Sequence, residues 1–175
     1  PGHYLLAGRE GVRVRQYWDV HFAPTVATPD QAAQRLAEVL DDAVRLVHSI
    51  MPPTPQLSWP LLNARAGCEI WVKHENHTAT GAFKIRGGIV MLEALKRADP
   101  ELRGVISATR GNHGQSLAWS GRRHGVRTVI VVPHGNSRDK NAAMRAWGAE
   151  LIEHGRDFDE AKEHAAGLAA SEGLQ

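Results

Sequence analysis

From residue 69 onward, the hydrophobic positions follow two periods in turn. Four short segments are rich in β-branched and other apolar residues, as buried strands are: residues 69–75, 104–109, 127–133 and 150–154. Four longer segments carry apolar residues at helical spacing: residues 83–98, 112–125, 137–149 and 157–173. This alternation predicts βαβ units, and therefore an α/β fold whose open sheet is mainly parallel.

One more helix is predicted before this alternation. Thr28 is a typical capping residue, Pro29 suits the first helical position, and apolar residues hold one face as far as Val47. The proline-rich stretch at residues 51–60 must be extended, because each proline disfavours a helical conformation in the residue before it.

The N-terminal residues 1–28 form no clear packing unit. Residues 12–18 alternate like a short strand, but no partner segment is evident, so we interpret this region as an irregular extension. The sequence begins with Pro1 instead of Met and stops at Gln175, where a further strand is expected after the last helix. We therefore expect it to be a fragment of a longer protein.

The composition narrows the function classes. With 42% hydrophobic and 23% charged residues, the chain has the make-up of a globular protein. Its net charge of +2 is spread evenly and no apolar run is long enough to span a bilayer, so we expect neither nucleic acid nor membrane as a partner. A single cysteine, Cys68, excludes an internal disulfide and suits the cytoplasm. We expect Cys68 to be buried, and Trp71, Trp119 and Trp147 to lie in the core.

Two loops that lead from a strand into a helix carry unusual residues. Ligands of open α/β sheets gather at such loops, beyond the carboxyl ends of the strands. In the first loop, Lys84 stands where a helix begins, and the free N–H groups there disfavour an ammonium ion. A neutral amine is the form that attacks an aldehyde to make a Schiff base. The alternative is a solvated surface lysine.

The second loop brings glycines and an amide to a helix start. Gly111 and Gly114 allow close backbone approach, and the free N–H groups of the helix start can bind an anion such as a carboxylate. Asn112 offers a neutral donor for a phenolate oxygen. The alternative is a helix cap with no ligand.

Together, the two loops resemble one enzyme family. The segment from Glu75 to Gly88, ENHTATGAFKIRGG, is similar to the lysine motif of pyridoxal-phosphate enzymes of the tryptophan-synthase-β fold type. Within that type it looks most like the serine/threonine dehydratases and serine racemases. The segment GNHGQ, from Gly111, resembles the asparagine loop of the same branch, and the likeness covers roughly residues 50–175.

The resemblance implies roles for the residues of both loops. Lys84 would hold pyridoxal phosphate as a Schiff base and later move the Cα proton of the substrate, while Phe83 would pack beside the cofactor. Asn112 would hydrogen-bond the ring oxygen of the cofactor. The substrate carboxylate would be bound by the second loop: Thr109, Arg110, Gly111, Asn112 and His113.

The implied reaction is β-elimination from a 3-hydroxy amino acid such as serine or threonine, which gives a 2-oxo acid and ammonia. The rival within the family is an amino-acid racemase. In serine racemases, a serine two residues before the asparagine protonates one face of the intermediate. That place holds Arg110, whose guanidinium does not exchange protons near neutral pH, so we favour elimination. Arg110 either pairs with an acidic substrate group or faces solvent.

The resemblance also implies a two-domain architecture. Residues 29–103 would be the N-terminal portion of a large cofactor domain and residues 104–175 most of a small α/β domain. The family's glycine-rich phosphate loop does not occur in this sequence. We therefore expect the chain alone to bind the cofactor weakly, and a noncatalytic α/β fragment remains the second alternative.

Two further expectations concern partners. The resemblance implies a small amino-acid substrate and, for the whole enzyme, a homo-oligomer. His74 and His77 match no standard zinc spacing, so we expect no metal.

Overall fold

The computed structural model describes residues 3–8, 11–16 and 28–175. Its contacts divide the chain into two units, Pro1–Leu40 and Asp41–Gln175. In the first unit, β1 (His3–Gly8) pairs with β2 (Gly11–Gln16) in antiparallel register.

The strand expected at residues 12–18 is confirmed as far as Gln16, and the rest of that prediction lies outside the described residues. The interpretation of the whole region as irregular is wrong for β1 and β2. The partner strand, HYLLAG, was missed because it shows no alternation of apolar and polar residues.

The long helix α1 (Pro29–Ile50) begins where the sequence indicates. The hydroxyl of Thr28 accepts a hydrogen bond from the N–H of Gln31 at 3.2 Å, which satisfies one free donor of the first turn. The helix continues three residues beyond the expected end at Val47, which is buried.

After α1 the chain is less regular than expected. A two-residue strand β3 (Gln56–Leu57) pairs with β4 (Val72–Lys73), which is all that forms of the strand expected at residues 69–75. Between them lies α2 (Pro60–Ala66), a helix that was not predicted because seven residues are too few to show a helical period.

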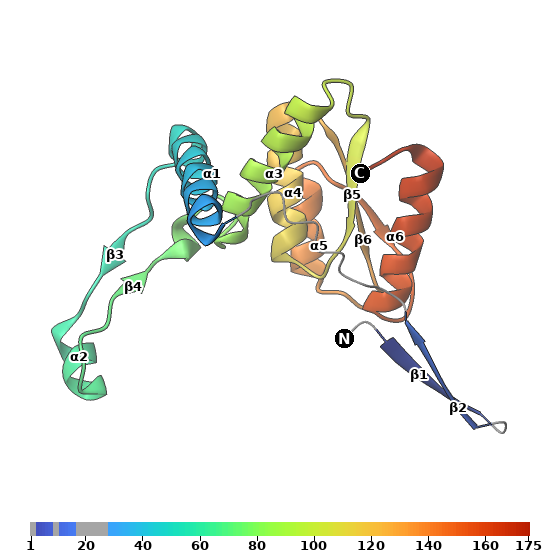
Figure 1. Cartoon of the computed structure of the whole chain (residues 1–175), viewed down its shortest axis with the longest axis horizontal. Helices are drawn as coiled ribbons and strands as arrows, with labels where there is room; N and C mark the ends of the chain where they lie inside the picture. Colours follow the sequence, from blue (N-terminus) through green and yellow to red (C-terminus); the bar gives the residue numbers. More distant parts are fainter. Residues whose placement is uncertain (1–2, 9–10, 17–27) are drawn as a thin grey trace. The chain divides into compact units, whose positions relative to one another are not determined.

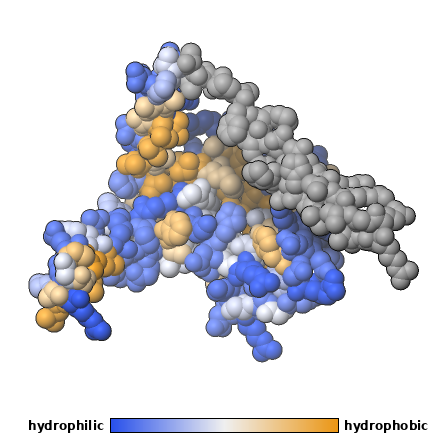
Figure 2. Space-filling model, turned by 60° about the horizontal axis from the view of Figure 1, so that its bottom comes forward, coloured by the Kyte–Doolittle hydropathy of each residue, from blue (hydrophilic) through white to orange (hydrophobic). Residues whose placement is uncertain are grey.

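Several large apolar side chains of α1 and of the β3–α2–β4 segment are exposed. Figure 2 shows hydrophobic residues, in orange, on the surface of these parts of the chain. Trp71 is 57% exposed and Cys68 is also exposed, so the expectation that both are buried is wrong. Both lie beside the short β3–β4 pair, which shields little from solvent. Trp119 and Trp147 do pack against hydrophobic cores, as expected.

The second unit is built on a parallel sheet of three strands: β5 (Gly104–Ala108), β6 (Arg127–Val132) and β7 (Glu150–Glu153). They lie in the order β5-β6-β7, with Val105 opposite Thr128 and Val129 opposite Glu150 (Figure 1). The expected α/β fold with parallel strands is confirmed.

Helices cover both faces of this sheet (Figure 1). On one face lie α4 (Asn112–His124) and α5 (Arg138–Ala146), and α3 (Lys84–Ala98) packs on α4. On the other face lies α6 (Phe158–Glu172). Successive residues of β6 serve the two faces: Ile130 packs in the core under α4, and Val131 packs against α6.

The C-terminal end of the chain is bonded to β5. The C-terminal residue Gln175 donates its N–H to Gly104 O at 3.1 Å, and its carbonyl accepts from Ile106 N at 2.8 Å. These bonds lie on the edge of β5 that does not face β6. The loop at residues 109–111 follows the carboxyl end of β5, the place where ligands of open α/β sheets gather.

Candidate active site

The loop before Lys84 is held in a defined shape by its own threonines. The hydroxyl of Thr78 donates to Ala82 O and accepts from Ala82 N, both at 2.9 Å, so it closes the loop after the 3-10 turn Glu75–His77. Gly81, whose φ is +66°, donates its N–H to Thr78 O at 2.9 Å. A left-handed conformation is one that glycine adopts without steric cost. The chain therefore enters α3 in a fixed conformation.

Lys84 is the first residue of α3 and its side chain is exposed. Its carbonyl oxygen accepts a hydrogen bond of 2.6 Å from the hydroxyl of Ser116, a fully buried residue of α4. Its Nζ lies 5.6 Å from the centre of the Phe83 ring. The backbone of Lys84 is thus fixed by α4, while its amino group is free to reach a ligand.

The Lys84 side chain lines a hollow of about 420 Å³ between α3 and α4. The hollow also has apolar walls from Phe83, Met91 and Leu117, and an imidazole from His113. Residues of both loops that the sequence singled out therefore meet in one place. Sequence reasoning named Phe83, Lys84 and His113, and it missed the two apolar residues, which look like ordinary core positions of a helix.

His113 is half-buried in this hollow. Its burial, and secondly the positive charge of Lys84, lower the pKa of its imidazole from the usual value of 6.5. Both causes favour the uncharged ring. At neutral pH, His113 thus adds an uncharged donor and acceptor beside the amine, and no second positive charge.

The second loop presents only some of the N–H groups that the sequence suggested. Thr109 is buried and donates its N–H to Val131 O at 3.1 Å, and Gly111 donates its N–H to the Thr109 hydroxyl at 3.3 Å. Within the described chain, the N–H groups of Arg110, Asn112 and His113 make no hydrogen bond. An anion at this loop would therefore be met by these three groups.

Four predicted site residues do not line the hollow: Thr109, Arg110, Gly111 and Asn112. The side chain of Asn112 is exposed at the first position of α4, and that of Arg110 is exposed just before it. Their proposed contacts with cofactor and substrate stay predictions. A Cβ at Gly111 would stand 2.9 Å from Cδ of Lys140, a flexible side chain that can move aside, so local space does not require glycine there.

The hollow fits part of pyridoxal phosphate. Its volume lies in the range of small-molecule sites, about 300–1,000 Å³, and it offers an amine for the aldehyde and apolar side chains for the ring. Its one guanidinium, that of Arg86, is already paired with Glu75. The described residues of the hollow therefore suit the ring and aldehyde and provide no free arginine for the phosphate.

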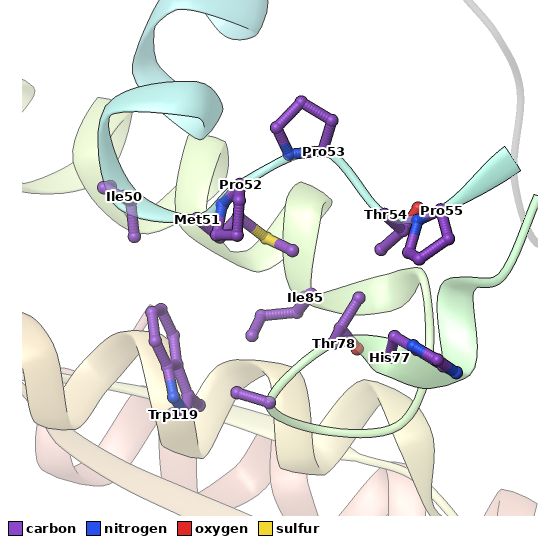
Figure 3. Close-up of a pocket in the computed structure, with 11 residues that line it drawn as sticks. Ile50, Met51, Pro52, Pro53, Thr54, Pro55, His77, Thr78, Ile85 and Trp119 are labelled. Atoms are coloured by element: carbon purple, nitrogen blue, oxygen red, sulfur yellow. The ribbon is translucent and has the colours of Figure 1, made fainter.

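A second hollow, of about 410 Å³, lies behind the Lys84 loop. Figure 3 shows Ile85 between Trp119 of α4 and Thr78 of the loop, with Met51 and the prolines that follow it on the far side. Ile85 is fully buried. Because successive helical residues point in different directions, Lys84 and Ile85 line different hollows.

Sequence reasoning also missed a polar network next to this loop. Arg86 and Glu75 form an ion pair, and Thr54 donates to the same carboxylate. A signal was available, because Glu75 and Arg86 lie inside the lysine motif, residues 75–88.

None of the described helices is long and apolar enough to cross a membrane.

The chain is similar to known proteins. The chain is 36% identical over 128 residues to the biosynthetic L-threonine dehydratase of Pasteurella multocida, a match that covers 73% of this chain and 25% of that protein. It resembles a crystal structure of a pyridoxal 5'-phosphate-dependent aspartate racemase with a TM-score of 0.75 and 32% identity, over 79% of this chain and 44% of that one.

A second solved structure, the processed threonine deaminase isoform 2 of Solanum lycopersicum, matches with a TM-score of 0.71 and 30% identity, over 87% of this chain and 43% of that one. The chain spans about a quarter of the length of the curated relatives that it matches. The family model described as pyridoxal-phosphate dependent enzyme matches residues 48–174. This chain therefore belongs to the family of pyridoxal-phosphate dependent enzymes.

Proposed function

We propose that this chain supplies the lysine-bearing part of the active site of a pyridoxal-phosphate-dependent lyase. The substrate is a 3-hydroxy amino acid, with threonine or serine as the default, and the products are a 2-oxo acid and ammonia. The observation that carries the proposal is that Lys84 and His113, from two separate loops, line one hollow of suitable size.

The residues of the hollow would divide the work. Pyridoxal phosphate, when bound, draws electrons away from the Cα of the amino acid that is attached to it. Lys84 Nζ would attach the cofactor and then take the Cα proton as a general base. The N–H groups of Arg110, Asn112 and His113 would bind the substrate carboxylate. The apolar side chains of Phe83 and Leu117 would lie beside the cofactor ring.

The elimination can be followed bond by bond. Lys84 would take the proton of the Cα–H bond, and the electrons of that bond would form a Cα=Cβ double bond as the Cβ–O bond breaks. The hydroxyl would leave as water with the proton that Lys84 returns. One water then returns in hydrolysis, which releases ammonia and leaves the 2-oxo acid. Because His113 is held uncharged, it does not oppose the positive charge that Lys84 gains with the proton.

The second candidate is an amino-acid racemase, which the likeness to the aspartate racemase structure favours. A racemase needs a second proton donor on the other face of Cα. The residue two positions before Asn112 is Arg110, an exposed guanidinium that stays protonated, which supports elimination.

We also propose roles for larger parts of the chain. Residues 29–103 would belong to a large cofactor domain and residues 104–175 to a small α/β domain, and the whole enzyme would assemble as a homo-oligomer in the cytoplasm. The irregular course after α1 and the regular βαβ order from β5 support the position of this boundary.

A chimeric enzyme tests the function. Residues 48–174 replace the matching segment of the Pasteurella multocida threonine dehydratase, and the product from threonine is measured by mass spectrometry. We expect 2-oxobutanoate and ammonia from this chimera, and a loss of activity of at least about 10³-fold in its Lys84→Ala form, because base and cofactor attachment are lost together.

Chiral chromatography of the remaining amino acid separates the two candidates. Inverted amino acid without a 2-oxo acid would support the racemase and contradict the lyase. A chimera that folds and binds pyridoxal phosphate but changes neither threonine nor serine would contradict the proposal as a whole.

A further inference from the structure

The segment that carries Lys84 is closed at its base by an ion pair. Nε of Arg86 donates to Oε2 of Glu75 at 2.9 Å, and Nη2 of Arg86 donates to Oε1 at 3.0 Å. This two-pronged geometry is the strong form of an arginine–carboxylate pair. The two side chains are 26% and 22% exposed, so water screens the pair less than it screens a surface pair.

The carboxylate is also anchored to a different part of the chain. The hydroxyl of Thr54, a buried residue, donates to Oε1 of Glu75 at 2.6 Å. Nζ of Lys73 donates to Thr54 O at 2.8 Å, and His74 N donates to Pro55 O at 2.8 Å. The base of the loop is thus tied to the stretch that precedes β3.

Both members of the pair keep their charge over a wide pH range. The Arg86 guanidinium lowers the pKa of Glu75 below its usual value, against the opposing effect of burial. The hydrogen bonds to Glu75 in turn raise the pKa of Arg86. We call this Glu75–Arg86 pair the clamp. At neutral pH both of its members are charged, so it is a full ion pair.

Lys84 lies between the clamp and a second fixed point. Arg86 is in the first turn of α3, so its tie to Glu75 fixes the start of the helix. From the α4 side, the Ser116 hydroxyl holds Lys84 O. The Lys84 side chain itself is exposed, and its Nζ has no hydrogen-bond partner among the described residues. The hydrogen bonds that hold Lys84 in place therefore all act on its backbone.

We propose that the Glu75–Arg86 ion pair, anchored by Thr54, is a positioning device that places Lys84 for reaction with the aldehyde of pyridoxal phosphate. This inference rests on the proposed function. Glu75 and Arg86 act through Lys84 and take no part in the bond changes. A lysine cannot replace Arg86 here, because a single ammonium lacks the planar fork that grips both carboxylate oxygens.

The experiment uses the 175-residue chain and three variants. Arg86→Lys and Glu75→Gln each weaken the clamp while keeping a polar side chain. Arg97→Lys is the matched control on the same helix, since Arg97 bonds Glu93 at 3.3 Å and is 80% exposed. Circular dichroism and urea unfolding confirm that each variant is folded under the conditions of the assay.

The first measurement is hydrogen exchange without cofactor. We expect the amides of residues 78–83 to exchange about tenfold faster in Arg86→Lys and Glu75→Gln, the factor that follows from losing one charge-assisted hydrogen bond. Amides of β6 should keep their wild-type rates in both variants. Equal acceleration in the loop and in β6 would indicate a general loss of stability and would contradict a local positioning role.

The second measurement is the site of modification by pyridoxal phosphate. The chain reacts with excess pyridoxal phosphate, borohydride fixes the product, and peptide mapping gives the ratio of modified Lys84 to modified Lys162, an exposed lysine of α6. We expect the initial ratio to fall by about tenfold in both clamp variants, because small displacements of a reacting group cost at least that much. In Arg97→Lys it should stay at the wild-type value.

The outcomes separate this inference from the proposed function. If wild-type Lys84 reacts no better than Lys162, the positioning of Lys84 in this chain is contradicted, and the chimera decides the proposed function separately. If Lys84 is preferred but neither clamp variant changes exchange or ratio, the clamp is wrong and the function stands. Should a clamp variant fail to fold, Thr54→Val provides a milder test, because it removes only the hydrogen bond from Thr54 to Glu75. In this variant the loop amides should exchange faster and the Lys84 to Lys162 ratio should fall, each by a smaller factor.

Discussion

At the residue scale, the proposed function depends on one amine and one imidazole that come together from two loops. The sequence marked Lys84 by its position at a helix start and His113 as part of the second loop. Each loop alone had an ordinary explanation, a solvated lysine in the first and a helix cap without ligand in the second. The fold brings both to one hollow because α3 packs along α4. That packing also explains why the charge of Lys84 reaches the ring of His113.

The electrostatic contact between these two residues can be measured directly. In Lys84→Met the pKa of His113 should rise, because the nearby positive charge is removed, yet stay below its usual value because the burial remains. An NMR titration of the imidazole protons checks this. Lys162→Met is the control, and an unchanged His113 pKa in Lys84→Met would mean that the two groups do not share the hollow.

At the element scale, the close approach of α3 to α4 is what forms the site. Gly88 makes this approach possible, since a Cβ there would stand 2.2 Å from Ser116 Oγ and 2.9 Å from Ser116 O. Ser116 is also the residue that holds Lys84 O. The sequence predicted α3 and α4 within two residues of their ends, but nothing in its period indicated which faces of the two helices meet.

Substitution of adjacent glycines tests this contact. Gly88→Ala should destabilise the chain by about 1–3 kcal/mol, because the added methyl group meets Ser116 in a packed interface. Gly87→Ala is the matched control: its Cβ meets nothing within 4 Å, and alanine favours a helix, so stability should be equal or higher. Urea unfolding gives both values, and equal effects of the two substitutions would refute the packing argument.

At the scale of the whole molecule, arginine–glutamate pairs connect elements that are distant in sequence. Arg127 of β6 bonds Glu150 of β7 at 2.7 and 2.8 Å and Glu172 of α6 at 2.5 Å. It thus links β6 to β7 and to α6. The guanidinium of Arg127 lowers the pKa of Glu150, just as Arg86 lowers that of Glu75.

Because of these pairs, we expect the folding stability of the chain to decrease as the pH falls. A carboxyl whose pKa is lower in the folded chain stabilises it above the unfolded pKa, near 4.5, and this stability is lost as pH falls through the folded pKa. Urea midpoints from about pH 6 to about pH 3 should therefore fall less in Glu150→Gln than in the wild type. Glu163→Gln, which removes an exposed carboxyl without an ion pair among the described residues, should follow the wild-type curve.

What the sequence determined by itself is the order and kind of the elements from α3 onward and the two loops that carry the proposed site residues. Periodicity and helix-start residues are local properties, and the chain from α3 to α6 obeys them. Short elements such as α2 and β1 were not predicted from the sequence, because a few residues show no hydrophobic period. A strand such as β1 also depends on the strand with which it pairs.

The tertiary structure decided the rest. Lys84 and His113 line the same hollow, whereas Asn112 does not. The N–H of Thr109 is bonded to Val131 O and is therefore not available to a ligand. Glu75 forms an ion pair with Arg86 close to Lys84 in the chain. Each of these facts depends on distances between segments that are remote in the sequence. No local pattern encodes such distances, because they follow from how helices and strands pack against one another.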